Sequence, residues 1–353
     1  MTSQPVESTD GAVEAQAHLH HAYLLGLQLM VARDHANDVV EDWIFRLFRR
    51  QHEEKFLSSF SKLGLEGLPD AVACARYHVL SNSIGGVGVE YLAESDTKAW
   101  VRFRYPRWMF AGAAICGVPV GASRGFLRGW YAQNGVTLGN PRLGFVCVSE
   151  DMTGEFGFCG YFREYPEALS DDQRLQFARE ELPPAFDADA QPRPPTAEWS
   201  PERLEKAYRN YAVEYIRNGL QALAQVLGAD VARDIGKRAG RLIGLQYYPD
   251  LARRVGAHDG DAADAAHFLA AMFAGLGDET TVLHSDARDA ELEQRGLRVL
   301  RGLDDASQSL LFECWAELWV GAIRSHRELL DVVWERVDGA TVRWRITARR
   351  SLA

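Results

Sequence analysis

An internal similarity is the feature that most constrains how this chain can fold. When the chain is shifted by the distance from Gly154 to Gly339, two segments align without a gap. The matched pairs are Phe126 and Leu311, Leu127 and Phe312, Trp130 and Trp315, Leu138 and Ile323, Arg142 and Arg327, and Glu150 and Glu335. Each segment has a helical pattern followed by two strand-like runs, and similarity at one fixed shift is typical of a repeated unit. We therefore predict an α+β fold with two related halves, each made of helices and a small antiparallel sheet. The alternative is chance, because any helix followed by a hairpin gives some apolar matches.

Prolines mark a boundary between the two halves. Six of the 13 prolines of the chain lie close together, at positions 183, 184, 192, 194, 195 and 201. Proline-rich segments with few apolar residues are typical of linkers between domains. We predict a disordered N-terminus over residues 1–12, a catalytic or ligand-binding half over residues 13–181, a linker over residues 182–201 and a second, related half over residues 202–353.

Composition narrows the class of partner. The formal net charge is −10, whereas nucleic acids and anionic membranes attract clusters of lysine and arginine, so we expect neither as a partner. No apolar run approaches the roughly 18 residues of a membrane-spanning helix. The five cysteines are scattered and form no CxxC pair, which favours a reducing, cytoplasmic setting without disulfides. We expect a small-molecule substrate, no bound cofactor and a possible homodimer.

Hydrophobic periodicity gives a coarse order of elements. Helical spacing begins near residue 13 and is clear over residues 36–62, and strand-like spacing is predicted over residues 71–105. There YHVLSNS and VGVEYL are separated by Gly85 and Gly86. A helix is predicted over residues 123–134 and two strands around a turn at Thr153 and Gly154. In the second half we predict helices over residues 202–227, 230–247 and 306–330, and strands within residues 280–292, 331–337 and 341–347.

Arginines and aromatic residues gather in the first half and make the first candidate site. Arginine binds carboxylates through two parallel hydrogen bonds, and aromatic rings offer flat faces to a ligand ring. Arg102 and Arg104 alternate on one strand face, and Arg124 and Arg128 share a helix face. The predicted substrate-binding residues are Arg102, Arg104, Tyr105, Arg107, Trp108, Arg128, Tyr131, Asn134 and Arg142. A small anionic ring compound would suit them, although solvated charges above core aromatics would give the same pattern.

Cysteine and acid–base chemistry make the second candidate. Cys116 follows a strand in a glycine-rich loop, and Cys159 lies in a predicted strand; either could act as a nucleophile with His78 as its base. Glu150, Asp151 and Glu155 flank a predicted turn, and Glu155 is the candidate general base. Small buried cysteines and solvated carboxylates are the structural alternative. We expect Cys147, which shares a strand face with Phe145, to be buried.

A metal site is the third candidate. The N-terminal histidines His18, His21, His35 and His52 could hold an ion only if three or four of them converge, and no HExxH motif is present. We therefore assign no metal ligand to the predicted site. A metal-dependent enzyme that uses these histidines is kept as an alternative.

The layout of the first half resembles the L-2-amino-thiazoline-4-carboxylic acid hydrolase family. The resemblance rests on VRFRYPRW, then Cys116, a helix, and a strand in TGEFGFCGYF, and it covers roughly residues 38–162. Family members have Cys-Pro where Tyr105-Pro106 stands here, and Gly-Asp where Gly154-Glu155 stands, and Cys159 comes one position late. The resemblance implies hydrolysis of a C–N bond in a small cyclic amidine or amide that carries a carboxylate.

Together, these patterns predict a hydrolase that cleaves a C–N bond in a small nitrogen-containing ring or amide with an anionic group. Its candidate catalytic residues are Cys116, Cys159, Glu155 and His78. The first alternative is a non-catalytic protein that binds or senses a small molecule, and the second is the metal-dependent enzyme.

Overall fold

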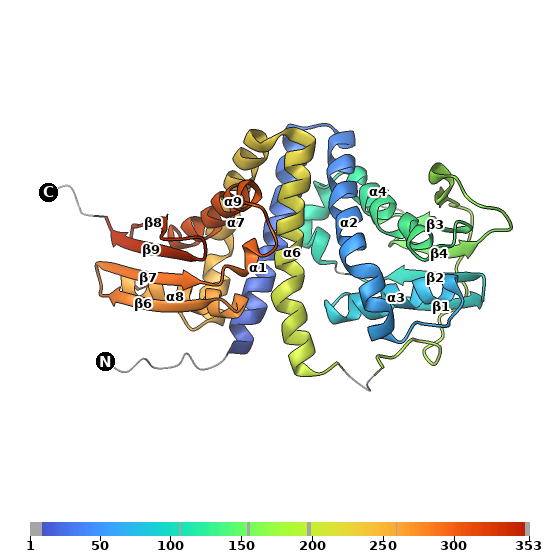
Figure 1. The fold of residues 1–353 in the computed structure, drawn as a ribbon, viewed down its shortest axis with the longest axis horizontal. Helices are drawn as coiled ribbons and strands as arrows, with labels where there is room; N and C mark the ends of the chain where they lie inside the picture. Colours follow the sequence, from blue (N-terminus) through green and yellow to red (C-terminus); the bar gives the residue numbers. More distant parts are fainter. Residues whose placement is uncertain (1–8, 106, 154–155, 196–198, 259, 350–353) are drawn as a thin grey trace. The chain divides into compact units, whose positions relative to one another are not determined.

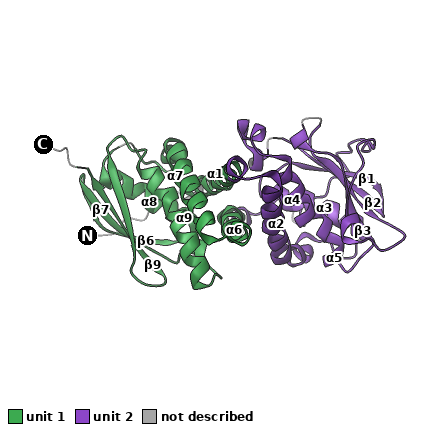
Figure 2. Ribbon diagram, turned by 90° about the horizontal axis from the view of Figure 1, so that it is seen from above, with its two compact units in different colours: residues 1–30, 205–353 green, residues 31–204 purple. Residues whose placement is uncertain are grey.

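The computed structural model describes residues 9–105, 107–153, 156–195, 199–258 and 260–349, without the side chains of Thr9, Asp10 and Trp108. It has the α+β fold class that the sequence predicts, with two halves and two separate small sheets. The chain divides into two compact units, coloured separately in Figure 2: unit 1 contains the described residues up to Met30 and from Glu205 onwards, and unit 2 contains Val31–Leu204. This division differs from the predicted one, because the first helix groups with the second half.

Unit 2 contains the region of the predicted site. Its α-helices are α2 (Asn37–Phe60), α3 (Asp70–Ile84), α4 (Val120–Gly129) and α5 (Asn134–Thr137). Its strands are β1 (Val89–Ser95), β2 (Lys98–Phe103), β3 (Leu143–Ser149), β4 (Cys159–Glu164) and β5 (Leu175–Phe177). Short 3-10 turns are η1 (Ser61–Leu63), η2 (Trp108–Phe110), η3 (Gly112–Cys116), η4 (Tyr131–Gln133), η5 (Asp151–Thr153) and η6 (Asp171–Gln173). The sheet order is β1-β2-β4-β3-β5, antiparallel except for the parallel pair β3 and β5.

Unit 1 repeats this plan. Its α-helices are α1 (Thr9–Asp34, of which the part up to Met30 belongs here), α6 (Pro201–Leu227), α7 (Ala229–Arg254), α8 (Ala262–Leu276) and α9 (Asp305–Ile323). Its strands are β6 (Glu279–Ser285), β7 (Asp289–Arg295), β8 (Leu330–Arg336) and β9 (Thr341–Ala348), and η7 spans Arg298–Leu300. The order β6-β7-β9-β8 matches β1-β2-β4-β3, and in both units a hairpin, a helix and a second hairpin follow one another. The shared topology supports the duplication.

Several element boundaries differ from the predictions. Residues 70–84 form helix α3 rather than a strand. The residues from Ala71 to Ala75 are all buried, so they do not show the alternation of a strand with one exposed face. Gly85 and Gly86, which were interpreted as a hairpin turn, instead follow the end of this helix. The helix predicted over residues 123–134 ends at Gly129, and Asn134 begins the short helix α5. Helix α9 ends at Ile323, before the predicted residue 330. The predicted turn at Gly154 lies outside the described residues.

Glycines set the distance between α2 and α4. Gly121, Gly125 and Gly129 recur every four residues on α4 and face the backbone of α2. A Cβ atom on Gly125 would lie 2.5 Å from the carbonyl oxygen of Glu41 and 2.9 Å from the amide nitrogen of Phe45. In unit 1, Gly236, Gly240 and Gly244 of α7 face α9 in the same way. The two helix pairs can therefore approach so closely only because these positions lack side chains.

We predict that Gly125→Ala lowers the free energy of unfolding by about 1–3 kcal/mol, although alanine favours a helix. The added methyl group would meet rigid backbone atoms that cannot rotate away. Urea unfolding followed by circular dichroism measures the change, with Gly339→Ala as the control because nothing lies within 4 Å of a Cβ atom there. Equal stability of the two variants would contradict the close packing.

Candidate functional site

The structure does not bring the predicted site residues together. Four of them, Arg102, Arg104, Tyr105 and Cys159, line one cavity. Three others, His78, Tyr131 and Asn134, are buried in the core of unit 2. The remaining described ones lie elsewhere: Arg107 in a buried ion pair, Cys116 exposed at the end of η3, and Arg128 and Arg142 in surface ion pairs with Glu41 and Glu164. Glu155 and the side chain of Trp108 lie outside the described part of the chain.

Both faces of the sheet of unit 2 carry an apolar cluster. The inner face carries Phe145 and Phe162, whereas the opposite face, which we call the outer face, carries a buried cluster of Leu92, Trp100, Val146, Val148, Cys159 and Tyr161. Beside this cluster the outer face also carries the charged residues Lys98, Arg102 and Glu90. Successive side chains of a strand point to opposite faces, so the two apolar sets alternate along β3 and β4. The run LGFVCV is buried at every position, as expected for a strand that is covered on both sides.

The segment that covers the outer face is the first part of the predicted linker and the strand before it. We call residues 175–191 the strap. It begins as β5 beside β3, and its Ala178 packs against the outer-face cluster. The linker prediction missed this role, because a proline-rich segment with few apolar residues gives no sign that it packs against a sheet.

Two polar side chains anchor the strap to the sheet. Glu181 accepts hydrogen bonds from Tyr161 Oη at 2.7 Å and from Lys98 Nζ at 3.0 Å. The amide group of Gln191 accepts from the backbone N–H of Tyr91 at 2.9 Å and donates to the Tyr91 carbonyl at 2.8 Å. Gln191 thereby satisfies backbone groups of the edge strand β1, as a neighbouring strand would.

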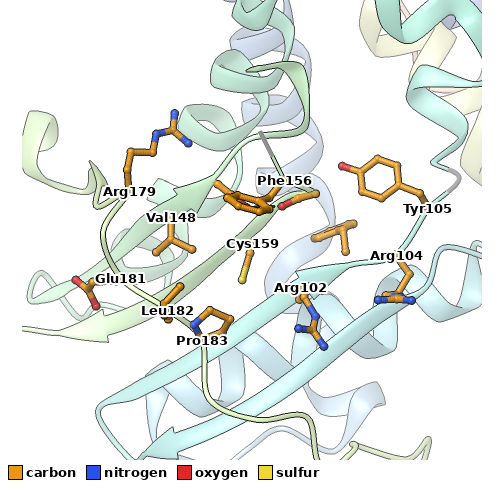
Figure 3. Close-up of a pocket in the computed structure, with 13 residues that line it drawn as sticks. Arg102, Arg104, Tyr105, Val148, Phe156, Cys159, Arg179, Glu181, Leu182 and Pro183 are labelled. Carbon is orange, nitrogen blue, oxygen red and sulfur yellow. Dashed lines mark hydrogen bonds between the residues drawn. The ribbon is translucent and has the colours of Figure 1, made fainter. Parts of the chain in front are cut away.

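Beneath one part of the strap lies a cavity of about 550 Å³, which we call the strap pocket (Figure 3). Its lining comes from the outer face, from the loop around Tyr105 and Phe156, and from the strap. The lining residues are Arg102, Phe103, Arg104, Tyr105, Val148, Ser149, Phe156, Gly157, Cys159, Arg179, Glu181, Leu182 and Pro183. This volume is in the range of small-molecule sites, and most of these side chains offer apolar atoms.

Positive charge surrounds the strap pocket, although the whole chain is acidic. Glu90 is shared by Arg102, whose Nη2 lies 2.6 Å from it, and by Arg104, whose Nε lies 3.5 Å away. The buried Glu150 is shared by Arg124 and by Arg179 of the strap. The charged lining residues are three arginines, Arg102, Arg104 and Arg179, and one carboxylate, Glu181. With their direct ion-pair partners Lys98, Glu90 and Glu150 they make four cations and three carboxylates. The excess of positive charge favours an anionic ligand.

Cys159 occupies the floor of the strap pocket, as Figure 3 shows. Burial raises the pKa of its thiol to about 11, although the charge of Arg102 acts in the opposite direction. At neutral pH the group is therefore a thiol rather than the nucleophilic thiolate. Burial also raises the pKa of Cys147, which lies on the inner face as predicted.

His78 is a core residue and not a partner of either candidate cysteine. Its ring stacks on Tyr131 at a centroid distance of 3.9 Å and is nearly parallel to the ring of Phe162 at 5.4 Å. Phe162 and Cys159 are three positions apart on β4 and point to opposite faces of the sheet, so the sheet separates His78 from Cys159. The catalytic pairing of His78 with Cys159 is therefore not present.

A directed chain of hydrogen bonds runs through this core. Arginine can only donate, so Arg49 Nη1 donates to His52 Nδ1 at 3.4 Å, which leaves the proton of His52 on Nε2. His52 then donates to Asn134 Oδ1 at 3.1 Å, and Asn134 Nδ2 donates to His78 Nε2 at 3.2 Å. Burial, together with the charge of Arg49, lowers the pKa of His52 to about 4, and burial holds the pKa of His78 well below its ordinary value. Both imidazoles are therefore neutral at pH 7.

A second buried group sits behind one wall of the strap pocket. Arg107 and Asp151 form an ion pair at 2.7 Å, and their side chains are 4% and 2% exposed. Tyr105 donates to the same carboxylate at 2.5 Å, and burial followed by this hydrogen bond raises the pKa of Tyr105 to about 12. The guanidinium group also faces the rings of Phe103, Phe110, Phe126 and Phe158. The expectation that acidic residues at this turn are solvated is wrong for Asp151 and for Glu150, because arginines pair with both inside the fold.

The N-terminal histidines do not converge on a metal site in the part of the chain that is described. His20 accepts a hydrogen bond from Trp315 Nε1 at 2.9 Å and contacts the carbonyl oxygen of Gln16 with its other nitrogen, and burial lowers its pKa to about 4. Among the described side chains, one group has metal-binding spacing: His284, Asp286 and Asp289, at an exposed hairpin, where the histidine contacts both carboxylates at 3.1 and 3.0 Å.

In the described part of the chain, no helix combines the length and apolar character needed to cross a membrane.

Comparisons with known proteins do not show a family for this chain. No protein-family model matches the chain, and neither does any curated protein. Solved structures that match include the Fe(II) unliganded H-NOX protein from K. algicida, with a TM-score of 0.28 and 13% identity over 40% of this chain and 75% of that one. A mutant of the same protein gives a TM-score of 0.29 and 10% identity over 47% of this chain and 83% of that one. TM-scores this low do not establish a common fold, so the function has to be inferred from the residues of this chain.

We predict that Asp151→Asn lowers the free energy of unfolding by about 3–5 kcal/mol, because it leaves the Arg107 charge buried without its counter-ion. Glu41→Gln is the matched control, since it breaks the exposed pair with Arg128 and should cost less than about 1 kcal/mol. Chemical unfolding of both variants measures the difference. Similar small losses in the two variants would show that Asp151 does not neutralise Arg107.

We also predict that the protein loses stability as the pH falls from 6.5 towards 4. The unfolded chain takes up protons on its histidines below pH 6.5, whereas His20 and His52 stay neutral in the fold down to about pH 4. Each such histidine contributes a slope of up to about 1.4 kcal/mol per pH unit. Urea unfolding at several pH values should give a shallower slope for His52→Gln, and the wild-type slope for the exposed control His258→Gln. An unchanged slope in His52→Gln would contradict the buried neutral state.

Proposed function

We propose that this protein binds a small anionic molecule in the strap pocket and does not transform it. The observation that carries the proposal is the strap pocket itself, an apolar cavity surrounded by an excess of arginine. Within unit 2 it also joins Arg102, Arg104, Tyr105 and Cys159, which the sequence analysis selected for ligand binding or chemistry. This corresponds to the small-molecule-binding alternative rather than to the hydrolase.

Arg104 is the best-placed residue to hold the anionic group. Its side chain is 64% exposed, and its ion pair with Glu90 is long, at 3.5 Å. Glu90 forms its shorter contact with Arg102. Arg104 therefore keeps hydrogen-bond donors for a ligand carboxylate, and a charge-assisted bond of this kind contributes about 1.5–3 kcal/mol.

The chemistry of the pocket supports binding more than hydrolysis. Hydrolysis of a C–N bond needs a nucleophile or an activated water and a group that transfers protons. The thiol of Cys159 is protonated at neutral pH, and His78 lies on the opposite side of the sheet. We therefore propose binding, and the experiments below also test for the hydrolysis that the family resemblance implies.

Calorimetric titration with octanoate, 1-naphthylacetate and the neutral octanamide tests the proposal. We expect at least one carboxylate to bind with a stoichiometry of one, octanamide to bind more weakly than octanoate, and Arg104→Ala to weaken carboxylate binding about tenfold or more. Arg128→Ala is the matched control, because Arg128 is also an exposed arginine paired with a glutamate but does not line the pocket. It should bind as the wild type does.

Two outcomes would overturn the proposal. The first is the absence of saturable binding of either carboxylate by the wild type. The second is turnover: incubation with L-2-amino-thiazoline-4-carboxylate, followed by mass spectrometry, should return the compound unchanged, and a hydrolysed product would favour the enzyme.

A further inference from the structure

Two large apolar side chains of the strap pocket's lining are exposed. Leu182 of the strap is 85% exposed and Phe156 is 77% exposed. Exposed apolar surface costs free energy, and where it borders a cavity it marks a place that a partner or ligand covers. A ligand confined to the floor around Cys159 would leave Leu182 in water. The ligand that suits this pocket is therefore long enough to reach beyond Cys159 to Leu182.

The lining gives this ligand a direction. Figure 3 shows Arg104 and Tyr105 at one end of the pocket, Cys159 and Phe156 in its middle, and Leu182 with Glu181 towards the other end. At the far end the charges already have partners, because Lys98 pairs with Glu181 and Arg179 pairs with Glu150. Arg104 has only its long contact with Glu90, so it attracts an anionic group most strongly. The charged end of the ligand therefore belongs at Arg104 and its apolar end at Leu182.

The walls favour a flexible chain over a flat ring. Val148, Cys159 and Pro183 offer small aliphatic or sulfur surfaces with no flat face for stacking. Phe103 turns its ring to Phe158 and Arg107, and Tyr131, which was predicted to flank a ring, is in the core. The lining has two other aromatic residues, Phe156 and Tyr105. The hydroxyl group of Tyr105 is hydrogen-bonded to Asp151.

We propose that the ligand is an extended amphipathic carboxylate, an alkyl-chain acid. Its carboxylate lies on Arg104, its chain crosses Phe156, Cys159 and Val148 beneath the strap, and its end covers Leu182. This inference rests on the proposed binding function and specifies the ligand class of the same site.

A chain-length series tests the inference. The full-length protein is titrated calorimetrically with hexanoate, octanoate, decanoate and dodecanoate below their micelle concentrations. We expect the affinity to rise by up to about fourfold for each added methylene group, as the chain extends towards Leu182. In the variant Leu182→Ser, hexanoate should bind as it does to the wild type, whereas the gain from octanoate to dodecanoate should shrink.

The control is Leu329→Ser, which removes a side chain that is 70% exposed and does not line the strap pocket. It should keep the wild-type dependence on chain length. A dependence that is equally steep in Leu182→Ser and in the control would overturn the inference, because the chain would then be buried elsewhere.

The outcomes separate the two proposals. If 1-naphthylacetate or hexanoate binds but affinity does not rise with chain length, the inference fails and the binding function stands. If no carboxylate of either type binds to the wild type, the binding function itself fails.

Discussion

The outer face of the five-stranded sheet in unit 2 is the constraint on which the proposed site depends. It carries an apolar cluster, with Trp100, Val146, Val148 and Tyr161 among its buried side chains, so it has to be covered. Between β4 and α6 the described residues form η6, β5 and the strap but no α-helix, so the strap provides the cover. The strap covers the face incompletely, and the strap pocket is the space that remains.

The two halves differ in what their outer faces require. In unit 1 the corresponding strands β7 and β9 carry Glu291 and Glu293 opposite Arg345 and Arg343, and the charges pair across the strands at 2.8–3.3 Å. A face of paired charges is stable in water and needs no cover. Unit 2 has one such pair, Arg102 with Glu90, but Trp100 and Tyr161 face each other beside it and need a cover. The same topology therefore gives a sheet face of paired charges in one half and a face with a covered apolar cluster in the other.

Buried charge in unit 2 supports the site without forming it. Glu150 connects Arg179 of the strap to Arg124 of α4, and Asp151 neutralises Arg107 while it fixes the hydroxyl group of Tyr105. Removing one partner of such a pair leaves a charge in a medium that solvates it poorly, so these residues hold the loop after β3 and the strap in place. The Arg49–His52–Asn134–His78 chain does the same for the helices on the other side of the sheet. His78, a candidate base in the sequence, is part of this buried chain of hydrogen bonds.

The sequence by itself determined the α+β class, the repeated order of hairpin, helix and hairpin, and the selection of Arg102, Arg104, Tyr105 and Cys159. These follow from local periodicity and from residue type, which the order of residues records directly. It also contained a signal that was not used: in LGFVCV both alternating sets are apolar, which indicates a strand covered on both faces. Only the tertiary structure decided what covers the outer face, that Arg107, Tyr131 and Asn134 belong to the core, and that the sheet separates His78 from Cys159. These depend on contacts between residues far apart in the chain, such as Glu181 with Tyr161 and Gln191 with Tyr91, and no local pattern specifies which distant partner a polar side chain will find.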